Sequence, residues 1–278
     1  MSKIEYTQFM QWEPFHHPDI SLPVIRRKVC DELITLLAGT SELLLSRGLS
    51  TLYGGCYPTR SAFHSAVSRL RKRGLITTEQ SGGDLPTLKL TPIAKTKLPA
   101  YYKPHKAWDK KWNKRWYIIM FDVPEKKRPY RDHLRTFLKQ NHFGFLQRSV
   151  WVTPRDVRAD YDDLNKAAAV DTVAFLFEAQ TVLGFGPQSI VREAWDFNHI
   201  QQIQELYIRV TEKNLQRLND TTNSQPDILS LLRMENQAYS QAMSIDPLLP
   251  KELHPANYNG LCVADLHHEL HHRVTEKL

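Results

Sequence analysis

Between residues 116 and 177, strand-like and helix-like apolar patterns follow one another in an order that few folds can accommodate. One amphipathic segment places Leu134, Phe137 and Leu138 on a single helical face. The predicted elements, in chain order, are a strand at 117–121, a helix at 129–140, strands at 143–147 and 149–153, a helix at 160–169 and a strand at 172–177. This βαββαβ order predicts a ferredoxin-like domain.

The segment before this domain predicts a second module. Residues 22–38 carry a helical apolar pattern, residues 41–55 form one or two short helices, and a third helix follows Pro58 and ends before Gly74. Strand patterns at 75–78 and 88–91 flank a turn with two glycines, which is typical of a β-hairpin. Three helices and a hairpin in this order predict a winged helix-turn-helix, which lays its third helix in the major groove of DNA.

With further helices predicted at 188–219, 227–244 and 260–274, the chain is expected to be an α+β protein of several units. Its 278 residues, of which 41% are hydrophobic and 24% charged, exclude wholesale disorder. The predicted parts are an N-terminal arm at 1–22, a winged helix DNA-binding domain at 23–98, a linker at 99–115, a ferredoxin-like domain at 116–186 and a helical C-terminal domain at 187–278.

Positive charge is concentrated in the first part of the chain. Residues 1–115 hold 19 Lys and Arg against 9 Asp and Glu, whereas the remainder is slightly acidic. Duplex nucleic acid is the most natural partner for such a segment, although an acidic protein or a membrane surface would also match the charge. The residues predicted to contact DNA lie on the outer face of the third helix and beside the hairpin turn: Thr59, Arg60, Ser61, His64, Ser65, Ser68, Arg71, Lys72 and Lys89. The alternative is an ordinary solvated helix face.

Several features favour the cytoplasm. Three cysteines at widely separated positions argue against a disulfide framework or a cysteine-rich zinc module. The N-terminus lacks the apolar core of a secretory signal, and no apolar run approaches the ~18 residues that cross a bilayer. We therefore expect a cytoplasmic protein without a membrane partner.

Two patterns could indicate catalysis. Asp122 directly follows the first predicted strand of the βαββαβ segment, where a carboxylate can hold a divalent metal for phosphodiester cleavage. In this respect the segment resembles the small ferredoxin-like nuclease of CRISPR adaptation systems, so a metal-dependent nuclease is the alternative function. The other interpretation, which we favour, is that Asp122 caps the following turn.

His268, Glu269 and His272 match the H-E-x-x-H pattern of zinc proteases. No third ligand follows, and Leu266, Leu270 and Val274 give the same segment an ordinary apolar stripe. A histidine-rich surface helix is therefore expected from 267 to 272, and neither a catalytic residue nor a resident metal or cofactor is predicted.

Trp108, Trp112 and Trp116 recur every four residues, which would place them on one face of a helical turn. A base-stacking platform is one interpretation, and aromatic cover for a domain junction is the one we favour.

The segment 246–260 reads DPLLPKELHPANYNG and resembles the DPxLPxxLxPxxWxG signature of PaaX-type transcriptional regulators, which repress operons of phenylacetic acid catabolism. Tyr258 stands where this family usually has Trp. Three further segments, at 65–75, 112–116 and 177–180, resemble the family's recognition helix, its Trp-rich entry to the central domain and the end of its fourth strand. His64 occupies a position where the family often has Arg.

The resemblance implies a homodimeric repressor that reads a palindromic operator and is released by an aryl-acyl-CoA, typically phenylacetyl-CoA. Phosphates of such an effector would be held by Arg or Lys and its acyl group by aromatic residues. Arg192, Trp195, Tyr207 and Arg209 are all candidates for these roles, and the sequence does not choose among them.

Overall fold

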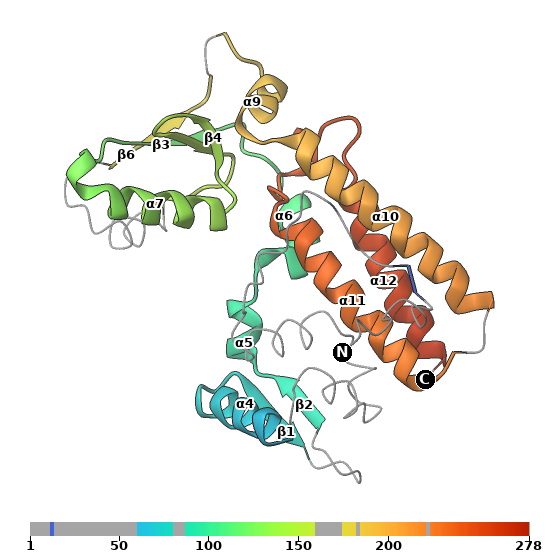
Figure 1. Ribbon diagram of the computed structural model, residues 1–278. Helices are drawn as coiled ribbons and strands as arrows, with labels where there is room; N and C mark the ends of the chain where they lie inside the picture. The colour runs from blue at the N-terminus through green and yellow to red at the C-terminus, as the bar shows by residue number, and fades with distance from the viewer. Residues whose placement is uncertain are drawn as a thin grey trace, which may run out of the picture. The chain divides into compact units, whose positions relative to one another are not determined.

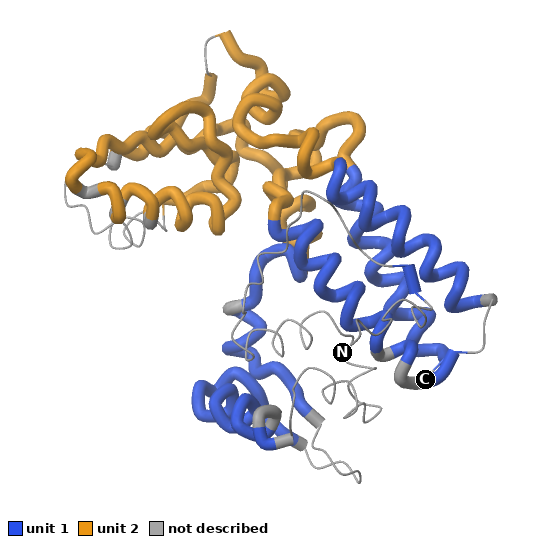
Figure 2. Tube along the Cα trace, viewed as in Figure 1, with its two compact units in different colours: residues 1–102, 202–244, 259–278 blue, residues 103–201, 245–258 orange. Residues whose placement is uncertain are grey.

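The computed structural model describes residues 12–13, 60–79, 87–158, 174–181, 184–220 and 223–277, which form a mixed α+β chain with a helical C-terminal part (Figure 1). This confirms the predicted fold class at that level. The chain forms two compact units, of which the first comprises Met1–Tyr102, Gln202–Ser244 and Asn259–Leu278 (Figure 2). The second comprises Lys103–Gln201 and Ile245–Tyr258.

The second unit contains a four-stranded antiparallel sheet. Its strands are β3 (Trp116–Phe121), β4 (Gly144–Gln147), β5 (Val150–Thr153) and β6 (Ala174–Ala179), and they lie in the order β4-β5-β3-β6. Each neighbouring pair is antiparallel, and β3 is a central strand. This order is the one that a βαββαβ segment takes in the ferredoxin-like arrangement. The helix predicted at 160–169 lies outside the described residues.

Helix α7 (Arg128–Gln140) covers one face of this sheet (Figure 1). Its Leu134 and Leu138 pack in a buried cluster with Tyr117, Ile119 and Trp151 of the strands. The helix ends in a Schellman motif, because the Phe143 N–H donates to the Leu138 carbonyl and the His142 N–H to the Lys139 carbonyl. His142 takes the left-handed position, with a φ of 62°.

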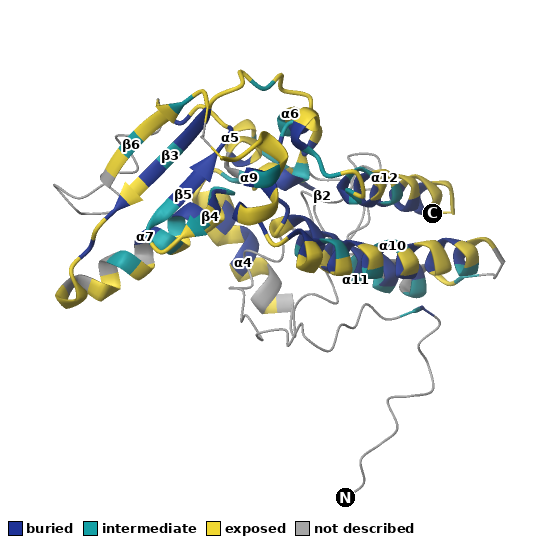
Figure 3. Ribbon diagram, turned by 90° about the horizontal axis from the view of Figure 1, so that it is seen from above, coloured by how far each residue is buried: buried dark blue, intermediate teal, exposed yellow. Residues whose placement is uncertain are grey.

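Helix α9 (Pro187–Ala194) packs on part of the opposite face, where Ile190 and Val191 join Trp116 and Val152 in a second cluster. The part of this face near β6 is exposed (Figure 3). Its apolar side chains are Met120, Phe175 and Phe177, which are paired or neighbouring positions in the β3–β6 ladder.

Three long helices follow: α10 (Phe197–Asp220), α11 (Gln225–Ser244) and α12 (Gly260–Lys277). The prediction of a single helix at 188–219 is wrong, because α9 ends at Ala194 and the helical conformation is interrupted at Trp195 and Asp196. The Asp196 carboxylate accepts a hydrogen bond from the His199 N–H at 3.0 Å and caps the start of α10. The other two helices confirm the predictions at 227–244 and 260–274. None of the described helices has the length and apolar character needed to cross a membrane.

At the N-terminal side, helix α4 (Arg60–Lys72) is followed by the antiparallel hairpin β1 (Ile76–Glu79) and β2 (Thr87–Leu90), and then by α5 (Pro92–Lys97). Gly74, with a φ of 66°, ends α4 in a second Schellman motif. The helices predicted before residue 58 and the glycine turn lie outside the described residues, so the complete winged helix stays a prediction.

The remaining short elements are η1 (Ala100–Tyr102), α6 (His105–Trp108), η2 (Glu125–Lys127) and η3 (Lys251–Leu253).

The three tryptophans do not share a helical face. Trp108 ends α6, Trp112 lies in the following loop and Trp116 begins β3. Trp108 is fully buried, with its ring edge-on to Tyr258 at 6.0 Å, and Trp112 contacts Trp116 at 5.3 Å. They are packing residues within the second unit.

Candidate nucleic-acid interface

Helix α4 has one buried face and one exposed face. Ala66, Val67 and Leu70 are buried, as their spacing requires for a helix that packs on one side. The predicted DNA-contacting residues that the structure describes all lie on the exposed side of the helix: Ser61, His64, Ser65, Ser68, Arg71 and Lys72. Thr59 lies outside the described residues, and of Arg60 only the place at the start of the helix is described.

The exposed face is cationic at its C-terminal end. Arg69, Arg71 and Lys72 occupy the last turn of α4, and Arg73 follows it, while the first turn has no acidic residue. Positive charge also suits a helix C-terminus, because it complements the helix dipole. Arg69 and Arg73 were not among the predicted contacts, although both are exposed and cationic, as Arg71 and Lys72 are.

Lys89 is exposed on β2, where it pairs with Thr77 of β1. The hairpin is tied to the end of α4, since the Thr91 hydroxyl donates to the Gly74 carbonyl at 2.6 Å and also caps α5. The hydrogen bond from Thr91 to Gly74 therefore links the predicted DNA-contacting residues of α4 to the hairpin that carries Lys89.

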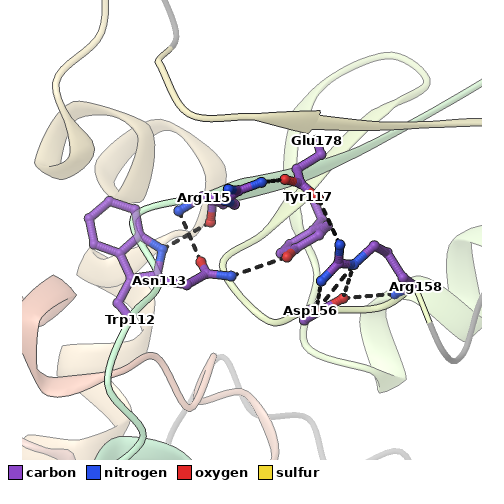
Figure 4. Close-up of polar contacts among 7 residues, drawn as sticks. All are labelled: Trp112, Asn113, Arg115, Tyr117, Asp156, Arg158 and Glu178. Carbon is purple, nitrogen blue, oxygen red and sulfur yellow. Dashed lines mark hydrogen bonds and ion pairs between the residues drawn. The ribbon is translucent and has the colours of Figure 1, made fainter.

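The start of β3 is held by a polar network (Figure 4). Arg115 forms an ion pair with Glu178 of β6, and Arg158 bridges Glu178 at 3.4 Å and Asp156 at 2.6 Å. Hydrogen bonding from Arg158 lowers the pKa of Asp156 to about 2. Each cation in this network has a carboxylate partner, so the network joins strands and is not an anion site. The Arg115–Glu178 ion pair joins two of the segments quoted for the family resemblance, at 112–116 and 177–180.

Asp122 is exposed directly after β3, as expected. Among the described residues, the only group of three potential metal ligands lies elsewhere, at Glu235, His267 and His271. Asp122 does not belong to that group.

The histidine-rich helix differs from the prediction. His268, Glu269 and His272 of the H-E-x-x-H pattern are exposed on α12, as a surface helix requires, but His267 and His271 are buried. The apolar stripe containing Leu270 and Val274 turns these two histidines inward, toward α11.

The loop after α11 is held mainly by Asp246, which is buried. One of its carboxylate oxygens accepts from the Leu248 N–H at 2.8 Å and the other from the Tyr258 hydroxyl at 2.7 Å. The Asp246 carbonyl contacts His142 Nδ1 at 2.8 Å, and His254 Nε2 contacts the Leu249 carbonyl at 2.8 Å. Tyr258 thus supplies the hydrogen bond of this motif from the position where Trp is usual.

Comparisons with known proteins agree with these features. Residues 109–191 match the family model described as PaaX protein central Cas2-like domain, and residues 195–277 match that of the PaaX-like protein C-terminal domain. The Transcriptional repressor PaaX of Escherichia coli K12 is 26% identical over 215 residues, a match that covers 75% of this chain and 63% of that protein.

The solved structure of the uncharacterized protein Rv0674 from Mycobacterium tuberculosis has a similar fold. It aligns with a TM-score of 0.53 at 16% identity and covers 88% of this chain and 94% of its own. Through its central and C-terminal domains, the chain belongs to the PaaX family.

Proposed function

We propose that the protein is a DNA-binding transcriptional regulator that acts as a dimeric repressor and has no catalytic function. The observation that carries this proposal is α4, whose outer face presents short hydrogen-bonding side chains and whose end presents a cluster of cations. The family and the printed name of the Escherichia coli relative support the same function.

In the proposed complex, α4 lies in the major groove. Arg60, Ser61, His64, Ser65 and Ser68 contact base edges or nearby phosphates, and Thr59, the preceding residue in the sequence, is proposed as a further contact. Arg71 and Lys72 neutralise backbone phosphates, and Lys89 contacts phosphates or the minor groove beside the hairpin. A dimer would place two such helices in successive major grooves, about 34 Å apart.

The test is a fluorescence-anisotropy titration with the duplex from upstream of the protein's own gene. Arg71→Ala and Lys72→Ala are expected to weaken binding, and each is expected to reduce the slope of log K against log salt by about one. Lys139→Ala removes an exposed lysine from α7 and is the matched control. Unchanged affinity in both α4 variants, with thermal melts like that of the parent protein, would remove the assignment of α4 to DNA.

The same duplex incubated with Mg²⁺ or Mn²⁺ tests the alternative. Intact DNA is expected. Cleavage that disappears in Asp122→Ala would replace the proposed regulator with a nuclease, and a protein with no salt-sensitive affinity for DNA would indicate an adaptor for an acidic partner.

Release by an aryl-acyl-CoA is proposed from the family resemblance. Among the candidate effector residues, Arg192 and Arg209 are exposed, whereas Tyr207 is buried and donates a hydrogen bond to Glu235. We therefore assign Tyr207 to the helix packing. Calorimetric titration with phenylacetyl-CoA and other acyl-CoA thioesters tests the effector, which is expected to bind and to lower the affinity for DNA.

A further inference from the structure

A carboxylate is enclosed between two histidines within the helical part of the first unit. Glu235 of α11 is fully buried. His267 Nδ1 lies 2.7 Å from one of its oxygens, and His271 Nε2 lies 3.1 Å from the other. The Tyr207 hydroxyl of α10 donates to Glu235 at 2.5 Å. Three helices therefore bring polar groups to one buried point.

The spacing of the ligand atoms is close to that of a metal centre. His267 and His271 are four residues apart on α12, so both rings leave the same helical face. One ligand atom from each of Glu235, His267 and His271 lies within 4.8 Å of the other two. Ligand atoms bound to a tetrahedral zinc ion at about 2.0–2.1 Å are about 3.3 Å apart. From 2.7 Å and 3.1 Å, the contacts of His267 and His271 to Glu235 would need to lengthen by about 0.6 Å and about 0.2 Å.

The residue types at this point also suit a metal ion. Glu235, His267 and His271 are all buried. A carboxylate binds a metal in its ionised form and an imidazole in its neutral form.

The surroundings fix the orientation of the cluster. The Tyr239 ring stacks on His267, with centroids 3.9 Å apart and planes 15° apart. The Tyr207 hydroxyl donates a hydrogen bond to the Glu235 carboxylate and holds it in position. Hydrogen-bonded neighbours of this kind orient the ligands of metal sites.

We propose that Glu235, His267 and His271 bind a divalent transition metal, with zinc as the best match, and that water takes the fourth position. Two imidazole nitrogens and one carboxylate oxygen are ligands that suit zinc, cobalt or nickel, in contrast to the all-oxygen sites of calcium and magnesium. The ion would link α11 to α12. This site is separate from the H-E-x-x-H pattern, whose His268 and His272 lie on the exposed side of α12.

The experiment uses the full chain without an affinity tag, stripped with a chelator and dialysed. Cobalt is added first, because a site with three protein ligands gives visible absorption bands, and zinc is then measured by competition with a chromophoric chelator. We expect one equivalent per chain, displacement of cobalt by zinc and a rise in Tm that saturates at one equivalent. A wild-type chain that binds neither ion at micromolar concentration would overturn the proposal.

Variants locate the ion. Glu235→Gln and His271→Ala are expected to abolish the cobalt bands, while the double variant His268→Ala/His272→Ala, which changes the exposed histidines of the same helix, is expected to keep them. The reverse result would show adventitious binding at the surface and overturn the proposal. Because the buried variants can destabilise the helices, X-ray absorption of the zinc-loaded wild type gives a second test. It is expected to show two imidazoles among light-atom ligands, and a shell without imidazole would exclude the site.

Discussion

Gly144 allows close packing between β4 and α9. A Cβ at this position would lie 2.6 Å from the Ala194 Cβ and 2.7 Å from the Trp195 ring. We predict that Gly144→Ala lowers the free energy of unfolding by about 1–3 kcal/mol, because the helix must move away from the sheet. Urea denaturation followed by tryptophan fluorescence measures this change. Gly186→Ala is the control, since nothing lies within 4 Å of a Cβ there, and an equal loss in both variants would contradict the packing explanation.

The Tyr258 hydroxyl provides a second test on the scale of a single residue. Tyr258→Phe removes the donor to the buried Asp246 carboxylate and leaves that oxygen with one partner fewer. The expected loss is about 1–3 kcal/mol. Differential scanning calorimetry on Tyr258→Phe and Tyr258→Trp would show whether an indole N–H in place of the hydroxyl restores part of that stability. A Phe variant as stable as the parent would show that this hydrogen bond does not hold the loop.

Two histidine rings contact backbone carbonyls of the loop from Asp246 to Pro250. Burial lowers the pKa of His142 and of His254, and each ring contacts a carbonyl of this loop. A histidine with a folded-state pKa below its unfolded value stabilises the fold fully above about pH 6.5 and loses that contribution as the pH falls toward the folded value.

We therefore predict that the urea midpoint of the protein falls between pH 7.5 and pH 5. The decrease should be smaller in His142→Asn and in His254→Gln. Asn is chosen at position 142 because it tolerates the positive φ that the backbone has there. Chevron or equilibrium denaturation at several pH values provides the measurement. A decrease of the same size in both variants and the parent would assign the acid sensitivity to other groups.

The sequence predicts the position of a helix or strand correctly where a local pattern of apolar and polar residues determines it. The strands of the sheet fall within two residues of their predicted positions, because their apolar runs are bounded by polar turns. The break between α9 and α10 was missed, because the helical apolar pattern continues through Trp195 and only Asp196, as a capping residue, signals it. The inward histidines of α12 were missed for a different reason. Their partner, Glu235, is more than thirty residues away, and no local pattern reports such a pair.

The sequence could predict which face of helix α4 is exposed, but not which of its side chains contact DNA. The sequence predicted an outer face of polar and cationic residues on this helix, and the structure places those that it describes on the exposed side. Which of these side chains reaches a base depends on the DNA and on the second copy of the chain. Neither is encoded in the spacing of residues on one helix, so the contacts stay predictions.

At the scale of the whole molecule, the exposed sheet face supports the proposed dimer. Phe175 and Phe177 are 61% and 47% exposed, with ring centroids 6.3 Å apart, and Met120 pairs with Phe175 in the ladder. We predict that the double variant Phe175→Glu/Phe177→Glu is monomeric by light scattering and binds DNA more weakly than the parent. Phe185→Glu, which changes an exposed phenylalanine outside the sheet, is the control. A variant with both glutamates that remains dimeric would exclude this face as the interface.

The chain passes between its two compact units four times, and one of these passages falls within α10, between Gln201 and Gln202. Neither unit is therefore a continuous piece of sequence that can be cloned with a single start and a single stop. A truncation after residue 194, where the two family models meet, would express the sheet without Leu249 and Leu253, which complete its apolar cluster on the α9 side. Fragments of this protein cut at that boundary are expected to be insoluble. A fragment that carries the sheet would need residues 245–258 joined to it through a designed connection.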